Sequence, residues 1–390
     1  MSRRGRLLVI SHACSRAVNR APYRALAALG WELGLVTVDG LPQDGRFLPS
    51  DPVAPGDPPT WMLPLSQQNA RRYRFVGLDA VLAAFQPDWV VLDNDPHSQL
   101  AVDLARGKRR AAYRLACLSC ENLPFTPAAL WARRGLRGWL LAHYLAWCRR
   151  IVRPALDLLF VINGAGASLF SAAGYRRVVR TPLGFPEAHF HRDPTARSTQ
   201  RQALALDGPV VAYFGRLTPE KGVHLLLDAL SGIVVPWTLL LDHFQALSAY
   251  QQHLKQRLDS DPRFAGRVRW IEAAHGAVGA LMNAADIVVL PSLSTPSWVE
   301  QYGRVAPEAM ACGCLVIAAR SGALPELIGD AGWLFPEGDV AALRALLARA
   351  LSAPEDCMAL RERAATQAAA TLSATAQAAL WDTELQAVAA

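Results

Sequence analysis

Short apolar runs alternate with amphipathic stretches along most of the chain, a pattern typical of parallel α/β folds. In the first half, the apolar runs predict strands near 6–11, 33–38, 88–93, 112–118 and 157–162. The stretches between them predict helices near 20–29, 76–86, 97–106, 128–150 and 164–173. Residues 39–65 are rich in Pro, Gly and Asp and are predicted to form a long loop.

The alternation pauses at a polar stretch and then restarts. We predict a linker over 187–205, between a first domain over 1–186 and a second over 206–369, and a helix over the Ala-rich residues 370–390. The second domain is predicted to have strands near 209–214, 237–242, 267–272, 286–291 and 314–319, and helices near 219–230, 245–258, 304–312 and 339–352. The expected fold is two Rossmann-like, doubly wound domains facing across a cleft, with ligands at the carboxyl ends of the strands.

The composition bounds the cellular setting. No apolar run reaches the roughly 18 residues that a membrane span needs. The first apolar run, Leu7 to Ile10, is too short for the core of a signal peptide and is predicted to be a strand. Seven cysteines without a regular spacing favour a reducing compartment, and we therefore predict a cytoplasmic protein.

Positive charge is concentrated in the first half of the chain. Residues 1–190 carry 24 Lys and Arg against 13 Asp and Glu, whereas residues 191–390 carry 16 against 20. This asymmetry predicts that the first half meets an anionic partner. Only three residues are lysines, so the position of Lys221 is more informative than that of a lysine in an average chain.

The first candidate site is the stretch FGRLTPEKG at 214–222. Gly215 allows a tight turn after a strand, and Arg216 and Lys221 flank that turn at the carboxyl edge of the sheet. Two cations in this position can hold a diphosphate leaving group, which gains negative charge as its bond breaks. The alternative is a capped surface helix with solvated charges.

Two glutamates form the second candidate. Glu300 and Glu308 stand seven residues apart around a predicted helix start, where the amides of Gly303, Arg304 and Val305 can bind an anion. Glu308 can then reach a ribose, and Glu300 the hydroxyls of a sugar. The alternative is that Glu308 is a helix-start carboxylate that favours the helix dipole.

The string EQYGRVAPEAMACGC (300–314) resembles the E-x7-E signature of family 4 retaining glycosyltransferases of the GT-B fold. The stretch at 214–222 resembles the donor-phosphate motif of that family, and SGALPELI (321–328) also fits. The resemblance is strong over about 205–352, extends over the first half only as architecture, and implies that the last helix crosses back to the first domain.

The resemblance implies the reaction and the roles of the site residues. The co-substrate would be a UDP- or GDP-sugar, and transfer would retain the anomeric configuration without a metal or other cofactor. Arg216 and Lys221 would hold the diphosphate, Glu308 the ribose and Glu300 the transferred sugar. The turn after the predicted strand 237–242 lacks the usual glycine, and residues 273–289 would bring backbone groups to the base.

The acceptor side is predicted from the loops of the first domain. Arg16 and Asn19 stand where the family often has a glycine-rich loop, and Glu121 stands where some members have a histidine. His97 is a further candidate for the acceptor cleft. All four residues can contact the acceptor, and Glu121 can also remove its proton. Ordinary surface contacts explain them equally well.

Residues 131–153 combine tryptophans with arginines, and 122–156 contain no acidic residue. This composition predicts contact with the anionic inner face of a membrane or with a lipid-linked acceptor. A solvated helix that packs on the sheet is the alternative.

The predicted function is hexosyl transfer to a glycan, lipid-linked or small-molecule acceptor in bacterial cell-surface polysaccharide or glycolipid synthesis. A nucleotide-sugar epimerase of the same fold is the main alternative. A nucleic-acid-binding protein is disfavoured because no nucleic-acid-reading module is recognisable.

Overall fold

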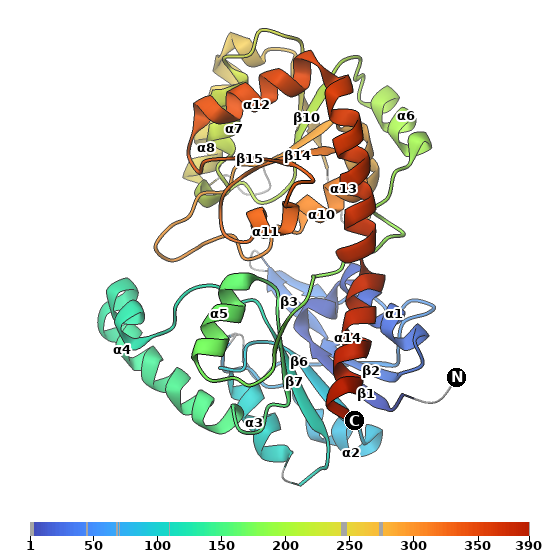
Figure 1. Ribbon diagram of the computed structural model, residues 1–390, viewed down its shortest axis with the longest axis vertical. Coiled ribbons are helices and arrows are strands. Elements are labelled where there is room, and N and C mark those ends of the chain that lie inside the picture. Colours follow the sequence, from blue (N-terminus) through green and yellow to red (C-terminus); the bar gives the residue numbers. More distant parts are fainter. Residues whose placement is uncertain are drawn as a thin grey trace. The chain divides into compact units, whose positions relative to one another are not determined.

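The computed structural model describes residues 4–43, 46–67, 69, 71–108, 110–242, 248–272 and 276–389. They form two compact units, each with a parallel sheet and flanking helices (Figure 1). Unit 1 comprises Met1–Pro186 and Ser373–Ala390, and unit 2 comprises Glu187–Leu372. The predicted class, two Rossmann-like α/β domains, is confirmed.

Unit 1 is built on a seven-stranded parallel sheet in the order β5-β2-β1-β6-β7-β8-β9. Its strands are β1 (Arg6–Ser11), β2 (Glu32–Val38), β5 (Thr60–Leu63), β6 (Trp89–Asp93), β7 (Arg114–Ser119), β8 (Leu158–Val161) and β9 (Val178–Arg180). Its helices before the domain boundary are α1 (Ala21–Ala28), α2 (Leu78–Phe85), α3 (Gln99–Gly107), α4 (Pro127–Val152) and α5 (Gly164–Ala172). The strand order reverses between β1 and β6, the place where open α/β sheets bind ligands.

The predicted long loop at 39–65 is partly wrong. It contains an antiparallel hairpin of β3 (Gly40–Gln43) and β4 (Arg46–Pro49), and it contains β5, which pairs in parallel with β2. The run TWML is short and lies between prolines, so its strand signal is weak in the sequence. It becomes a strand because β2 offers an unpaired edge.

Unit 2 repeats the architecture with a six-stranded parallel sheet in the order β12-β11-β10-β13-β14-β15. Its strands are β10 (Val210–Tyr213), β11 (Thr238–Asp242), β12 (Val268–Ile271), β13 (Ile287–Leu290), β14 (Leu315–Ala319) and β15 (Trp333–Phe335). Its main helices are α6 (Pro194–Ala203), α7 (Val223–Leu230), α8 (Ala249–Ser260), α9 (Val278–Ala284), α10 (Val305–Ala311), α11 (Leu324–Ile328), α12 (Val340–Ser352) and α13 (Met358–Thr371). Here the order reverses between β10 and β13.

The polar stretch 187–205 is predicted to be a linker, but the structure has a helix of unit 2 there. Asp193 caps α6 by accepting hydrogen bonds from the amides of Thr195 and Ala196, and Pro194 occupies its first turn. The helix packs against α9. None of the residues of α6 is buried, so its sequence is polar and resembles that of a loop.

The last helix, α14 (Ala374–Ala389), lies beside α1 in unit 1 (Figure 1). Trp381 is its anchor: the indole stacks on Phe160 at a centroid distance of 4.5 Å and donates a hydrogen bond to Thr181 Oγ1 at 2.9 Å. The next residue, Asp382, accepts a hydrogen bond from Trp31 Nε1 at 2.9 Å. Helix α14 therefore belongs to the core of unit 1, together with residues from the first half of the chain.

Trp381→Ala is expected to lower the free energy of unfolding by about 3–5 kcal/mol, because it empties a fully buried site and removes a buried hydrogen bond. Urea unfolding followed by circular dichroism measures the change. Thr383→Ala, an exposed position on the same helix, serves as the control. An unchanged unfolding midpoint for Trp381→Ala would show that α14 is not part of the core.

Candidate active site

Two loops of unit 2 meet where its strand order reverses. One follows β10 and the other follows β13, and the amide of Leu293 in the second donates a hydrogen bond to the carbonyl of Glu220 in the first at 2.8 Å. Gly222 makes the approach possible, since a Cβ there would lie 1.9 Å from the carbonyl oxygen of Pro291 and its φ is +68°. The contact brings the two predicted motifs together.

Lys221 and Glu300 form the centre of this site. Lys221 Nζ lies 2.6 Å from Glu300 Oε2, and Ser292 Oγ donates to the same oxygen at 2.9 Å. The lysine also lies over the ring of Trp298, 4.9 Å from its centroid. The Glu300 side chain is only 8% exposed and that of Lys221 19%. A buried carboxylate and a cation are therefore held side by side at the edge of the sheet.

The position of Glu300 is set through its backbone. Its carbonyl accepts a hydrogen bond from the amide of Ala323 at 3.0 Å. Gly322, with φ +52°, passes so close that a Cβ would lie 2.0 Å from that carbonyl oxygen. The stretch 321–328 thus holds the backbone of Glu300 in place, and the close approach explains why position 322 is a glycine.

Arg216 lies on the exposed loop after β10, next to Gly215. Tyr213 Oη donates to the Arg216 carbonyl at 2.7 Å, and Gly215 has φ +137°, a conformation that favours glycine. Within the described residues, the Arg216 side chain makes no hydrogen bond or ion pair. These contacts fix the backbone at Arg216, whose side chain is exposed.

Glu308 lies in the first turn of α10, with its side chain 12% exposed. Burial raises the pKa of this carboxyl from 4.5 to about 7, against the lowering effect of the Arg304 guanidinium 3.9 Å away. Gly303 has φ +82° and directly precedes Arg304 and Val305. The predicted anion site at these three amides stays a prediction.

Three contributors to this site were missed in the sequence: Ser292, Trp298 and Gly222. Ser292 follows β13 after a single proline, at the carboxyl edge of the sheet, and that position is the signal that could have found it. The other two depend on how the loops pack.

Two predictions about the donor pocket fall outside the described residues. The turn expected after 237–242 falls on 243–247, and the segment predicted to contact the base begins with 273–275.

On the acceptor side, Glu121 lies after β7 beside a second carboxylate. Its Oε2 lies 3.4 Å from Arg71 Nη2, and its Oε1 accepts from the amide of Leu123 at 3.2 Å. Asp95 follows β6 and accepts a hydrogen bond from Ser119. Burial and the nearby Glu121 charge raise the pKa of Asp95. The predicted residue thus belongs to a polar cluster at the carboxyl edge of the sheet.

Arg16 and Asn19 take part in structural contacts. Arg16 Nη1 lies 3.1 Å from Asp51 Oδ1, and Asn19 Nδ2 donates to the carbonyl of Ala13 at 2.7 Å. These contacts hold the loop after β1 against the segment near residue 51. They favour the alternative in which both residues stabilise the loop.

His97 follows β6 but is buried among aromatic side chains. The residue is 2% exposed, and its ring packs on Phe125 and Phe170 and faces Tyr175 Oη at 3.2 Å. Burial lowers the pKa of His97 to about 3, and the charge of Arg71 acts in the same direction. This position argues against the predicted acceptor contact.

Polar residues that sequence reasoning missed lie at the reversal point of unit 1. His12 follows β1 and Asn94 follows β6, and both contact Tyr73: its Oη lies 3.4 Å from His12 Nδ1 and accepts from Asn94 Nδ2 at 2.9 Å. Their positions directly after two neighbouring strands could have identified them. Across the described part of the chain, no three His, Cys, Asp or Glu side chains form a potential metal site.

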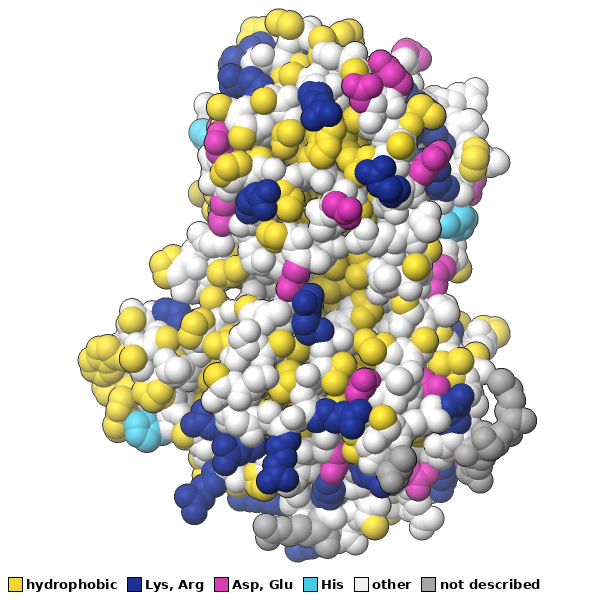
Figure 2. All heavy atoms as spheres, in the orientation of Figure 1, with side chains coloured by type: hydrophobic (Ala, Val, Ile, Leu, Met, Phe, Trp, Pro, Cys, Tyr) yellow, Lys and Arg dark blue, Asp and Glu magenta, His cyan; other side chains and the backbone are white. Residues whose placement is uncertain are grey.

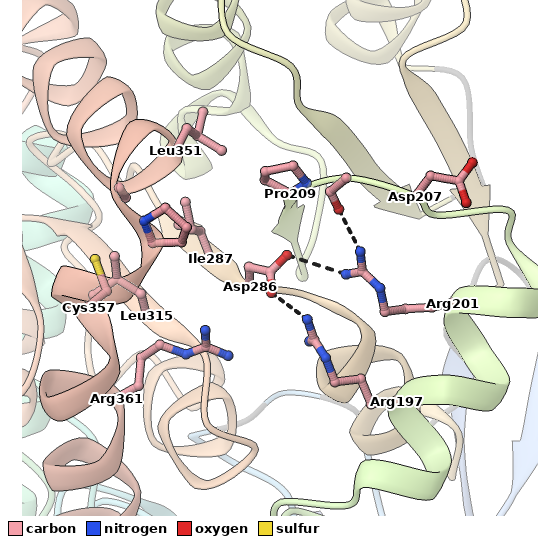
Figure 3. Close-up of a pocket in the computed structure, with 13 residues that line it drawn as sticks. Arg197, Arg201, Asp207, Pro209, Asp286, Ile287, Leu315, Leu351, Cys357 and Arg361 are labelled. Atoms are coloured by element: carbon pink, nitrogen blue, oxygen red, sulfur yellow. Dashed lines mark hydrogen bonds and ion pairs between the residues drawn. The ribbon is translucent and has the colours of Figure 1, made fainter.

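A pocket at the opposite, amino edge of the unit 2 sheet is a structural joint (Figure 3). Arg197 and Arg201 of α6 bind Asp286 at 2.6 and 3.4 Å, and Arg201 also donates to the carbonyl of Gly208 at 2.6 Å. Arg361 Nε donates to the carbonyl of Gly313 at 2.6 Å. These contacts tie α6 and α13 to the strand ends, away from the two motifs.

Comparison with known proteins relates unit 2 to glycosyltransferases. Residues 196–367, most of unit 2, match the family described as "Glycosyl transferases group 1". The GDP-mannose-dependent alpha-(1-6)-phosphatidylinositol monomannoside mannosyltransferase of Mycolicibacterium smegmatis is 33% identical over 227 residues, 54% of this chain and 57% of that protein. The putative colanic acid biosynthesis glycosyltransferase WcaL of Salmonella typhimurium is 26% identical over 215 residues, 54% of this chain and 51% of that protein. The chain thus spans about half the length of these relatives.

Two solved structures resemble the whole chain. HepE of Anabaena, in complex with UDP and glucose, has a TM-score of 0.71 at 20% identity and covers 98% of this chain and 100% of its own. Sucrose-phosphate synthase from Thermosynechococcus elongatus has a TM-score of 0.72 at 20% identity, with coverage of 98% and 99%. At such identities the likeness shows the fold alone, and that fold is GT-B.

No helix of the described residues is both long and apolar enough to span a bilayer.

Proposed function

We propose that the chain is a retaining, family 4-type glycosyltransferase that moves a hexose from a nucleotide-diphosphate sugar to an acceptor. The pairing of Lys221 with Glu300 carries the proposal, because it joins the two sequence motifs at the ligand-binding point of unit 2. The match of residues 196–367 to a glycosyltransferase family supports it.

In the proposed reaction, the bond between the anomeric carbon and the diphosphate oxygen breaks, and a bond to the acceptor oxygen forms on the same face. The acceptor proton leaves with the diphosphate. Arg216 and Lys221 stabilise the charge that develops on the leaving group, so no metal is required. Glu300 accepts hydrogen bonds from the sugar, and Glu308 from the ribose. Helix α10 has only seven residues. We therefore assign the binding of the diphosphate to Arg216 and Lys221 and not to the amides at the start of α10.

The acceptor is proposed to be a bacterial cell-surface glycan or a lipid-linked precursor, handled at the cytoplasmic face of the membrane. Relatives named for phosphatidylinositol monomannoside and colanic acid support this class of acceptor, whereas a relative named for D-inositol 3-phosphate supports a small-molecule acceptor. The nucleotide of the donor is proposed to be UDP or GDP, because one relative is GDP-mannose-dependent and HepE has been solved in complex with UDP-glucose.

The proposal is tested by incubating the purified chain with UDP- and GDP-sugars and a panel of glycan, lipid-linked and small-molecule acceptors, with and without EDTA, and measuring nucleotide release. We expect release with one donor, unaffected by EDTA, and an NMR spectrum of the product with the anomeric configuration of the donor. A reaction that inverts that configuration, or that only epimerises the sugar, would contradict the proposal. The absence of release with every donor would also contradict it.

Arg216→Ala is expected to lower kcat/KM for the donor roughly tenfold to a hundredfold, because it removes a cation from the leaving group. Stability should be unchanged within about 0.5 kcal/mol, since the side chain is exposed and makes no ion pair with the described residues. Arg363→Ala, another exposed arginine of unit 2, is the control. Equal activity of the two variants would remove Arg216 from the site.

A further inference from the structure

Exposed large apolar side chains are concentrated on one helix of unit 1. Among the described residues, half of the large hydrophobic side chains that stand exposed belong to α4: Trp131, Leu136, Trp139, Leu140 and Trp147. Figure 2 shows hydrophobic side chains gathered where α4 projects in Figure 1, with basic side chains nearby. Contiguous apolar surface of this kind marks an interaction site.

The helix is two arms joined by a sharp reversal. Gly135 has φ 55° and ψ −136°, which breaks the helix into arms over 127–134 and 136–152. The arms touch at Gly138, where a Cβ would lie 1.9 Å from the carbonyl oxygen of Leu130. We call residues 131–140, which surround the reversal, the α4 tip.

The longer arm has two apolar faces. One face is buried against unit 1 through Ala142, Leu145, Cys148 and Val152. The other contains Leu136, Trp139 and Leu140, at helical spacing, and is exposed. A helix that packs on one face needs no second apolar face for folding. The exposed face therefore points to a partner outside the chain.

The charge around the tip selects the partner. Residues 122–156 contain no acid, and Arg134 and Arg137 are exposed within the tip. Arg133 is engaged, since it donates to the carbonyls of Pro124 and Ala129. Exposed Trp and Leu side chains flanked by arginines match the interface of an anionic bilayer, where indoles lie at headgroup level.

We propose that the α4 tip docks on an anionic lipid surface, with Leu136, Trp139 and Leu140 entering the interface and Arg134 and Arg137 binding the headgroups. This narrows the predicted contact from 131–153 to the tip, because Trp147 lies beside Tyr144 and stacks with Arg106 of α3. The link between this docking and an acceptor at the membrane rests on the proposed function. The docking itself does not depend on sugar transfer.

A second copy of the chain is a poorer fit to the same surface. Two tips brought together would place like-charged arginines against one another with no acidic residue of 122–156 to pair with them. A membrane with anionic lipids supplies both the apolar layer and the negative charge. The two occupants are distinguished by whether the variants change vesicle binding or self-association.

The test is co-sedimentation of the full chain with vesicles of phosphatidylcholine, with or without phosphatidylglycerol. We expect at least roughly tenfold tighter binding to the anionic vesicles. Leu136→Ser/Trp139→Ser/Leu140→Ser and Arg134→Gln/Arg137→Gln should each weaken that binding roughly tenfold or more. The matched controls, Val234→Ser/Met358→Ser and Arg110→Gln/Arg363→Gln, change exposed residues elsewhere and should bind as the wild type does.

Equal binding to both vesicle types, or binding that the tip variants leave unchanged, would overturn the inference. So would a dimer, seen by analytical ultracentrifugation, that the tip variants abolish while vesicle binding persists. Circular dichroism and nucleoside diphosphate binding check that the variants are folded. Vesicle binding without sugar transfer would sink the transferase proposal and leave the docking inference standing.

Discussion

Lys221→Ala is expected to lower kcat/KM for the nucleotide sugar about a hundredfold or more, a larger loss than that expected for Arg216→Ala. The ammonium is the cation paired with Glu300 at 2.6 Å, and in the proposed reaction it stabilises the departing diphosphate. Steady-state assays of nucleotide release measure the loss. Lys255→Ala changes an exposed lysine of the same unit that pairs with Asp259, and it should keep wild-type activity.

The loss must be separated from a folding defect. Removing Lys221 leaves Glu300, 8% exposed, without its cation, which costs up to about 3 kcal/mol of unfolding free energy. The double variant Lys221→Ala/Glu300→Gln removes the stranded charge and should recover much of that stability while activity stays low. Near wild-type activity in either variant would exclude the pair from catalysis.

Glu308→Gln is expected to stabilise the donor-free protein at pH 8 by up to about 3 kcal/mol, and by less than about 1 kcal/mol at pH 5. The pKa of Glu308 is about 7 in the folded chain against an ordinary 4.5, so the folded state holds the proton more tightly than the unfolded state. The glutamate therefore favours folding at low pH. Its contribution to the free energy of unfolding declines as pH rises from about 4.5 to about 7.

The same substitution should weaken nucleoside diphosphate binding roughly tenfold or more at pH 8, because an ionised carboxylate is the stronger acceptor for ribose hydroxyls. Wild-type binding should strengthen from pH 6 to pH 8 as Glu308 loses its proton. Urea unfolding and calorimetric titration at both pH values measure the two effects, with the exposed Glu355→Gln as control. A Glu308→Gln variant that is less stable at pH 8 yet binds nucleotide normally would assign Glu308 a structural role.

Most residues of the candidate site in unit 2 could be singled out from the sequence, because its charged groups and turns lie within two short stretches. Residues 214–222 and 300–308 each contain their own turn, charges and carboxylates, and each follows an apolar strand. The ion pair between Lys221 and Glu300 was not predictable. It depends on a contact between two loops, which needs Gly222 to lie against the carbonyl of Pro291.

The acceptor side was harder because residue type does not reveal which way a loop side chain points. His97 follows a strand, as a ligand-binding residue would, but aromatic neighbours hold it in the core. The α6 helix was not predicted for a related reason: Arg197 and Arg201 are polar residues whose partner, Asp286, lies 89 and 85 residues further along the sequence. Short edge strands such as β5 depend on a neighbour that only the fold supplies.

A crystal structure with a bound nucleoside diphosphate tests the central claim most directly. We predict the diphosphate between Arg216 and Lys221 and the ribose hydroxyls on Glu308, at the reversal between β10 and β13. Density for the diphosphate at the amino edge, against Arg197, Arg201 and Arg361, or anywhere in unit 1, would contradict the account.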